Sequence, residues 1–178
     1  SLRMGASYEA TCWGLLGHQI LQRGEVDQLR RVPVARMKGN LSSKFKPGNS
    51  WADVWRLTDK DDGAQIFGNP DDLLRIELDE TSGSGYQWSV QALKDAGGLV
   101  LSDESTYSRE PLVYGGPSKR TVIARPPAGA AGTITLRELQ PWREAAKDDS
   151  SFSVALKMHG PEPGGLSRAD RRRMGLAI

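Results

Sequence analysis

Three short segments that lie far apart in the chain carry the residues best suited to binding chemistry. They are Thr81-Ser82-Gly83-Ser84-Gly85-Tyr86, Val113-Tyr114-Gly115-Gly116 and Gln140-Pro141-Trp142. Glycine lacks a Cβ and lets the backbone approach a partner closely, while serine and threonine hydroxyls both donate and accept hydrogen bonds. A tryptophan fixed by a preceding proline buries a large area at little conformational cost, and tryptophan is enriched among binding hot spots. These segments therefore predict three binding loops.

Residues that catalysis or metal binding would require are scarce and scattered. The sequence has no His-Glu-x-x-His, Cys-x-x-Cys or Gly-x-x-x-x-Gly-Lys motif, so nothing indicates a zinc hydrolase or a nucleotide-binding protein. His18 and His159 lack a Cys or carboxylate at ligand spacing, and we interpret them as surface or helix-packing residues. The acidic pairs at 61–62 and 71–72 lack the spacing of a calcium loop and are interpreted as turns. We predict no enzyme activity, no cofactor and no metal site.

Composition narrows the partners and the compartment. The 178 residues carry a net charge of +2, and no apolar run approaches the ~20 residues that span a bilayer, so we predict no membrane partner. Basic residues at positions 36, 38, 44 and 46 have no aromatic stacking pattern beside them, which argues against nucleic-acid binding. The single Cys12 and the lack of a visible signal peptide favour the cytoplasm. Ser1-Leu2 ahead of Met4 leaves a removed export signal open.

Apolar and β-branched runs on both sides of the three segments predict the strands that would position them. These runs cover residues 54–57, 64–67, 73–78, 86–90, 99–101, 105–107, 120–124, 132–139 and 152–158. Several of them alternate apolar and polar residues with a period of two, as half-buried strands do. Frequent turns and no helical pattern between the runs predict an all-β sandwich or barrel of about eight strands. In a sandwich, connections between alternate strands cluster at one end, where we expect the three loops.

The N-terminal part has a different pattern. Residues 7–31 repeat apolar side chains at steps of three and four, which predicts helices, with Ser7 as the first cap. We expect Gly24 to end the first helix, and a second helix to run from Glu25 to Arg31, before Pro33. The expected organisation is a helical segment and linker at 1–50, with the linker at 35–50, a β-sandwich at 51–160, and a flexible basic tail at 161–178.

The three loops resemble, in the same order, the binding loops of the chagasin family, which are proteinaceous inhibitors of papain-like cysteine peptidases. That family shows an Asn-Pro-Thr-Thr-Gly-Tyr/Phe loop, a Gly-x-Gly-Gly loop and an Arg-Pro-Trp/Phe loop. The matching residues here are Ser84, Gly85, Tyr86, Gly115, Gly116, Pro141 and Trp142. Trp88 matches a tryptophan that commonly follows the first loop, and we assign it to the core. The resemblance covers about residues 55–160 and implies an immunoglobulin-like β-sandwich.

The loops depart from the family pattern at four positions. Thr81 and Ser82 replace the family's Asn and Pro, Val113 replaces the first glycine of the second loop, and Gln140 replaces the Arg of the third. Without the proline the first loop has more freedom before binding, which predicts a lower affinity because ordering a loop opposes association. Replacing Arg by Gln140 removes a charge.

The resemblance implies that the chain blocks a papain-like cysteine peptidase and catalyses nothing. Three loops at one end of the sandwich would fill the active-site cleft, with Ser84 and its loop at the thiolate. Gly115, Gly116 and Trp142 would flank it.

A second, shorter resemblance gives an alternative function. The segment Ser7-Tyr8-Glu9-Ala10, followed by two leucine-bearing helices, is similar to the C-terminal end of ImmA/IrrE-type zinc metallopeptidases. Under that hypothesis the sandwich is a non-inhibitory interaction or regulatory domain at the C-terminus of a bacterial metallopeptidase-type regulator. The sequence leaves both functions open.

Overall fold

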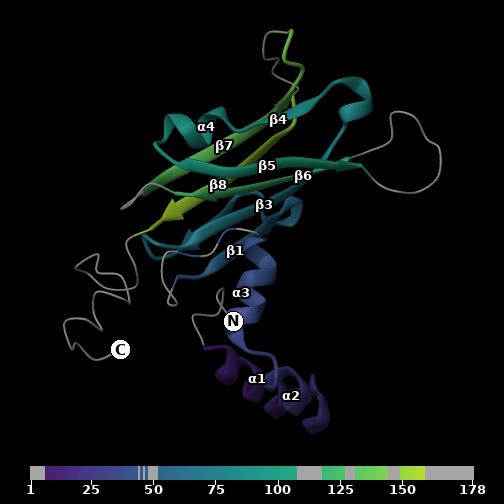
Figure 1. Cartoon of the computed structure of the whole chain (residues 1–178), viewed down its shortest axis with the longest axis vertical. Coiled ribbons are helices and arrows are strands. Elements are labelled where there is room, and N and C mark those ends of the chain that lie inside the picture. Colours follow the sequence, from purple (N-terminus) through teal and green to yellow (C-terminus); the bar gives the residue numbers. More distant parts are fainter. Residues whose placement is uncertain are drawn as a thin grey trace. The chain divides into compact units, whose positions relative to one another are not determined.

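The chain divides into two compact units, residues 1–46 and residues 47–178. The structure is a computed structural model that describes residues 7–43, 45, 47, 52–107, 118–126, 131–143 and 149–158. Figure 1 shows helices in the first unit and mainly strands in the second. The predicted mainly β fold, preceded by a short helical segment, is confirmed. The predicted tail at 161–178 lies outside the described residues.

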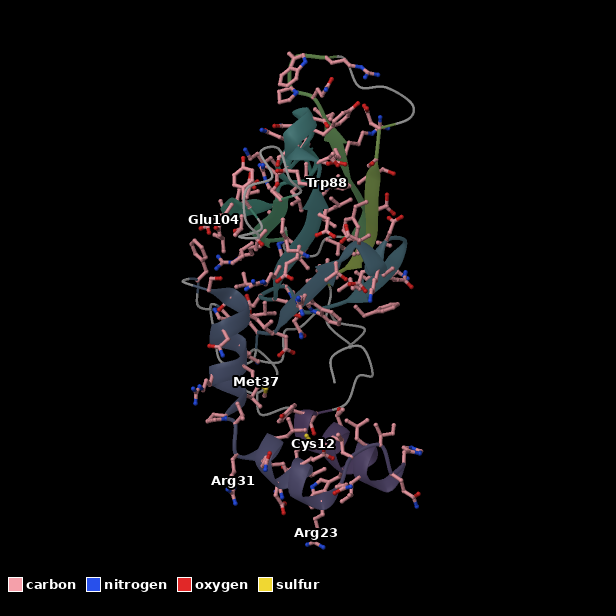
Figure 2. All side chains as sticks on the ribbon, turned by 90° about the vertical axis from the view of Figure 1, so that its right-hand side faces the viewer. Cys12, Arg23, Arg31, Met37, Trp88 and Glu104 are labelled. Atoms are coloured by element: carbon pink, nitrogen blue, oxygen red, sulfur yellow. The ribbon has the colours of Figure 1, made fainter. Side chains whose placement is uncertain are left out.

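The first unit contains three helices, α1 (Tyr8–Gly17), α2 (Arg23–Arg30) and α3 (Val34–Ser42). Ser7 caps α1 as predicted, because its Oγ accepts a hydrogen bond from the backbone N–H of Ala10 at 3.1 Å. Cys12 on α1 and Val26 on α2 are fully buried, and Figure 2 shows Cys12 among these helices. None of the described helices is long and apolar enough to cross a membrane.

The helix boundaries in this unit correct two predictions. The first helix ends at Gly17 rather than Gly24, since Gln19 takes a left-handed conformation with φ 58° that breaks the helix. Gly24 lies instead in the first turn of α2, where a Glu25 carboxylate oxygen accepts the Gln22 N–H at 2.7 Å. The predicted linker at 35–50 contains most of α3, which begins directly after Pro33 because proline has a backbone preset for a helix start.

The second unit contains eight strands in two four-stranded sheets (Figure 1). The first sheet has the order β1-β3-β6-β5 and the second the order β2-β8-β7-β4. The strands of the first sheet are β1 (Val54–Thr58), β3 (Leu73–Glu80), β6 (Ser118–Arg125) and β5 (Leu99–Tyr107). Those of the second are β2 (Ala64–Phe67), β8 (Ser151–Lys157), β7 (Ala131–Leu139) and β4 (Gln87–Ser89).

The core lies between the two sheets, and both contribute to it in the alternating pattern of strands. The fully or nearly buried apolar side chains include Leu57, Leu74, Ile76, Leu78, Val122 and Ala124 from the first sheet, and Trp88, Ile134, Leu136, Phe152, Val154 and Leu156 from the second. Trp88 is 6% exposed and its indole N–H donates to the backbone oxygen of Asp79 at 2.8 Å. Its predicted place in the core is confirmed, and Figure 2 shows it among the strands.

Two further details of the strands differ from the prediction. Residues 99–101 and 105–107 belong to one continuous strand, β5, with a bulge between Val100 and Ser102. The intervening Ser102-Asp103-Glu104 is polar without interruption, so the sequence reads as two strands. A short helix, α4 (Gln91–Asp95), lies between β4 and β5 where no helix was expected. Five residues give too few turns for a helical repeat to stand out.

Strand pairing brings several chain ends to one end of the sandwich. Glu80 at the end of β3 and Tyr107 at the end of β5 both pair with Ser118 at the start of β6. In the other sheet, Gln87 at the start of β4 pairs with Leu139 at the end of β7. We call the end of the sandwich defined by these five residues the loop end.

Candidate functional site

The loop end holds the first and third predicted binding loops. Residues 81–86 connect β3 to β4, and residues 140–142 follow β7 directly. The two loops are neighbours because β4 and β7 pair at Gln87 and Leu139, the strand residues next to the loops. The second predicted loop, with Val113, Tyr114, Gly115 and Gly116, lies outside the described residues. Its flanking strands, β5 and β6, nevertheless meet at the loop end.

The first loop is a tight turn rather than an extended segment. Ser82–Ser84 form one turn of 3-10 helix, in which the Ser84 N–H donates to the Thr81 oxygen at 3.0 Å. The following Gly85 has φ 78°, a left-handed conformation that favours glycine. Thr81, Gly83 and Ser84 are exposed. The loop therefore presents a turned backbone and compact hydroxyls to a partner.

The third loop contacts the first loop through two side chains. The Gln140 side-chain amide donates a hydrogen bond to the Ser84 backbone oxygen at 2.9 Å. The Trp142 ring packs so closely on Gly85 that a Cβ there would lie 2.3 Å from the indole carbon Cη2. Trp142 is still 73% exposed. The two loops therefore touch at Ser84 and Gly85 and leave most of the indole free for a partner.

Two buried carboxylates hold the two ends of the first loop. Glu138, which is 6% exposed on β7, accepts the N–H of Thr81, the first loop residue, at 2.6 Å. Glu80, which is 2% exposed, accepts the N–H of Trp88, just after the loop, at 3.1 Å. A hydrogen bond to a charged group contributes about 1.5–3 kcal/mol. Both ends of the loop are thus anchored to the sandwich.

Glu80 also joins the strands that flank the second loop. It accepts hydrogen bonds from the hydroxyls of Ser105 on β5, at 3.0 Å, and Ser118 on β6, at 3.2 Å. Arg120 on β6 donates to the same carboxylate at 3.4 Å and also to Asp103 on β5. The hydrogen bond to Asp103 and the nearby acidic charges raise the pKa of Arg120, so it remains a cation. One carboxylate therefore links β3, β4, β5 and β6 beneath the loop end.

Sequence reasoning missed Glu80 and Glu138, although a signal was present. Glu80 extends the buried alternation of Leu74, Ile76 and Leu78 on β3, and Glu138 extends that of Ile134 and Leu136 on β7.

An acidic residue at a core-facing position next to a loop must be paired, because burying an unpaired charge is costly. Neighbouring backbone N–H groups of a loop supply such pairing. An acidic residue that continues a buried alternation therefore indicates an anchor for the adjacent loop.

The exposed groups of the two described loops suit binding rather than bond breaking. They are hydroxyls, backbone groups, one side-chain amide and a large aromatic surface, all uncharged in residues 81–86 and 140–142. Within the described ranges, no group of three or more His, Cys, Asp or Glu side chains could hold a metal ion. The geometry can fill a groove in a partner and exclude water from it.

Comparison with known proteins places this geometry in a family. Residues 69–156 match the family model described as Chagasin family peptidase inhibitor I42. The chain is 28% identical over 111 residues to amoebiasin-2 of Entamoeba histolytica, a match that covers 61% of this chain and 88% of that protein.

Among solved structures, the chain is similar to the cysteine protease inhibitor EhICP2 from Entamoeba histolytica, with 24% identity and a TM-score of 0.48 over 62% of this chain and 99% of that one. It is also similar to amebosin, with 19% identity and a TM-score of 0.42 over 59% of this chain and 97% of that one. The family match contains both described loops. Residues 69–156 of this chain therefore form a domain of the chagasin family of peptidase inhibitors.

Proposed function

We propose that the chain inhibits papain-like cysteine peptidases by filling the active-site cleft with the loops of its loop end. The observation that carries this proposal is the pair of mutually packed loops, residues 81–86 and 140–142, inside the family match. The name of the relative EhICP2 describes a cysteine protease inhibitor. The family consists of inhibitors rather than enzymes, which supports a role in binding without catalysis.

In this proposal each loop has a separate role. Ser84 and the backbone around it enter the cleft at the catalytic thiolate, because the turn carries this residue outward and Gly85 allows close approach. Trp142 packs against the wall of the cleft as a hydrophobic anchor. A contact of Gly115 and Gly116 with the peptidase stays a prediction from the sequence, because both residues lie outside the described ranges.

Two of the departures from the family pattern leave the first loop with a defined shape. Thr81 and Ser82, in place of Asn and Pro, form a tight turn whose ends are held by Glu138 and Glu80. None of the relatives reported above is a metallopeptidase, so the alternative of a metallopeptidase-type regulator is not proposed.

Titration of active papain with the purified chain tests the proposal. The expected result is a stoichiometric and reversible loss of peptidase activity, with the chain intact by mass spectrometry after prolonged incubation. Full papain activity at micromolar concentrations of the chain would contradict it.

Replacing Trp142 with alanine should weaken inhibition strongly. The exposed indole is the largest apolar surface of the described loops, and truncating a hot-spot tryptophan costs about 2–4 kcal/mol of binding. The inhibition constant for papain, measured from progress curves, is the readout. Phe67→Ala is the matched control, because Phe67 is 62% exposed at the far end of β2, away from the loop end. Equal effects of the two substitutions would rule out Trp142 as an anchor.

A further inference from the structure

The contacts between the first and third loops point to a positioning role for a residue that departs from the family pattern. We propose that Gln140 fixes the first loop in its binding shape before any peptidase arrives, together with the packing of Trp142 on Gly85. The consequence for inhibition rests on the function proposed above, whereas the effect on the free protein does not.

The side chain of Gln140 forms a hydrogen bond that connects the third loop to the first. Its side-chain amide donates to the Ser84 oxygen at 2.9 Å, across 56 positions in sequence. The Ser84 oxygen belongs to the peptide group that joins Ser84 to Gly85, so holding it fixes the orientation of that peptide plane. Gly85 is free to rotate, because glycine populates both signs of φ. Gln140 therefore restrains the loop next to one of its two intrinsically mobile residues.

The indole of Trp142 packs on Gly85. Any Cβ at position 85 would lie 2.3 Å from Cη2 and 2.8 Å from Cζ2 of Trp142, closer than real contacts allow. The edge of the ring at Cη2 therefore lies against one α-hydrogen of Gly85. The indole ring and the left-handed φ of 78° at Gly85 together limit rotation of the peptide between Ser84 and Gly85.

Restraining the first loop before binding should increase the affinity of the chain for a peptidase. A loop that already has its bound shape loses less entropy on association, and a loop that has that shape only part of the time binds more weakly by that fraction. The family's proline would restrict the first loop from within. In this chain Gln140 and Trp142 restrict it from the neighbouring loop.

The first experiment measures the free protein and needs no peptidase. Protons that lie at the edge of an aromatic ring, close to its plane, resonate downfield, so the α-hydrogen of Gly85 that faces Cη2 of Trp142 should show a downfield shift in the NMR spectrum. Gln140→Ala should reduce this shift and speed exchange of the Gly85 amide hydrogen. Gln91→Ala is the matched control, because the Gln91 amide donates to Asp95 at 2.7 Å on α4, away from the loops. An unchanged Gly85 spectrum in Gln140→Ala would overturn the proposal.

The conservative variant Gln140→Glu separates donation from size. A carboxylate has the shape of the amide but cannot donate to the Ser84 oxygen. Gln140→Glu should therefore lose the Gly85 shift as Gln140→Ala does. A wild-type spectrum in Gln140→Glu would show that the hydrogen bond does not restrain the loop.

A pair of glycine substitutions isolates the indole contact. Gly85→Ala and Gly63→Ala impose the same backbone strain, because the two residues have φ 78° and 73°, but a Cβ at Gly63 meets nothing within 4 Å. Both should lower the melting temperature, while only Gly85→Ala should move the indole resonance of Trp142. Similar indole resonances in the two variants would contradict the packing described here.

The second experiment measures inhibition of papain. Gln140→Ala should raise the inhibition constant by about fivefold, mainly through slower association. Without the Gln140 hydrogen bond the first loop must become ordered as it binds, at a free-energy cost similar to that of ordering one side chain. The effect should be smaller in a Trp142→Ala background, since both residues act on the same loop. Additive effects would mean that Gln140 contacts the peptidase independently. If the wild-type chain fails to inhibit, the proposed function fails, while the NMR result still decides the positioning role.

Discussion

At the scale of single residues, the loop end depends on carboxylates that no partner would touch. Glu80 is 2% exposed and accepts hydrogen bonds from groups on three other strands. A buried carboxylate is stable only when such donors compensate for the loss of water. Because Glu80 is the last residue of β3, these hydrogen bonds lie directly below the first loop.

Glu80→Ala should lower the free energy of unfolding by about 3 kcal/mol, because the Trp88 N–H and the Ser118 hydroxyl lose their acceptor in a buried place. Urea denaturation followed by tryptophan fluorescence measures this change.

Glu104→Ala is the control for that measurement. Glu104 is exposed on β5, and its carboxylate accepts a hydrogen bond from the Ser102 hydroxyl at 3.0 Å. Its loss should change the free energy of unfolding by less than about 0.5 kcal/mol. A similar loss in both variants would mean that Glu80 contributes no more than a surface residue.

At the scale of elements, β1 and β3 are joined by an ion-pair cluster around Glu77. Arg56 on β1 donates to Glu77 at 2.7 and 3.0 Å, and Arg75 on β3 donates to its other oxygen. Burial alone would raise the pKa of Glu77, but the hydrogen bonds and charges of the two arginines outweigh burial. The pKa of Glu77 therefore lies below its ordinary value of 4.5.

This shift makes the contribution of Glu77 dependent on pH. The unfolded chain binds the proton more readily than the folded one, so the stabilisation is present above about pH 4.5 and disappears as the pH falls through the folded pKa. Glu77→Gln should therefore lower the free energy of unfolding by about 2 kcal/mol at neutral pH and by progressively less in acid. Urea titrations across the acidic range measure the difference between wild type and variant.

Asp79→Asn is the matched control on the same strand. Asp79 pairs with Lys119 at 3.0 Å, but both side chains are at least half exposed, and such surface pairs contribute little. The buried Asp72 has the opposite dependence on pH. Burial raises its pKa above 3.8, so its effect on the free energy of unfolding becomes less favourable as the pH rises. Comparing each variant with the wild type cancels that contribution. A difference for Glu77→Gln that does not vary with pH would contradict the explanation.

A helix or strand can be predicted from the sequence when its residue pattern is clear within the segment itself. Strands such as β3 and β8 were expected close to their observed bounds, because their alternation runs without interruption. β5 was divided in two because its middle, Ser102-Asp103-Glu104, is wholly polar. α3 was missed because Gly39 and its polar residues resemble a linker, although Pro33 before it is a helix-start signal.

The candidate site shows the same distinction. The loop residues could be singled out as candidates because glycine, proline and tryptophan, as at Gly85, Pro141 and Trp142, stand out even in short segments. Their convergence followed from the expected sandwich. The contact of Gln140 with Ser84 could not be predicted, since it joins residues 56 positions apart and depends on the register of β4 against β7.

At the scale of the whole molecule, the family match and both described loops lie in the unit formed by residues 47–178. Helices α1 to α3 belong to the unit formed by residues 1–46. Nothing in the proposed inhibition requires a residue of the helical unit.

A chain restricted to residues 47–178 should therefore inhibit papain with an inhibition constant within about twofold of the full chain, because the binding energy comes from the loops. Circular dichroism would first establish that the shortened chain retains its strands. A folded but much weaker inhibitor would show that residues 1–46 take part in binding.

The short strand β4 and the bulged strand β5 have a consequence for self-association. Each lies at the edge of its described sheet, and an open edge invites pairing with strands of other molecules. β4 is only three residues long, and β5 carries the exposed acidic residues Asp103 and Glu104 next to its bulge. Short length, charge and irregularity all oppose growth of a sheet across molecules. These two edges are therefore poor templates for pairing with strands of other molecules.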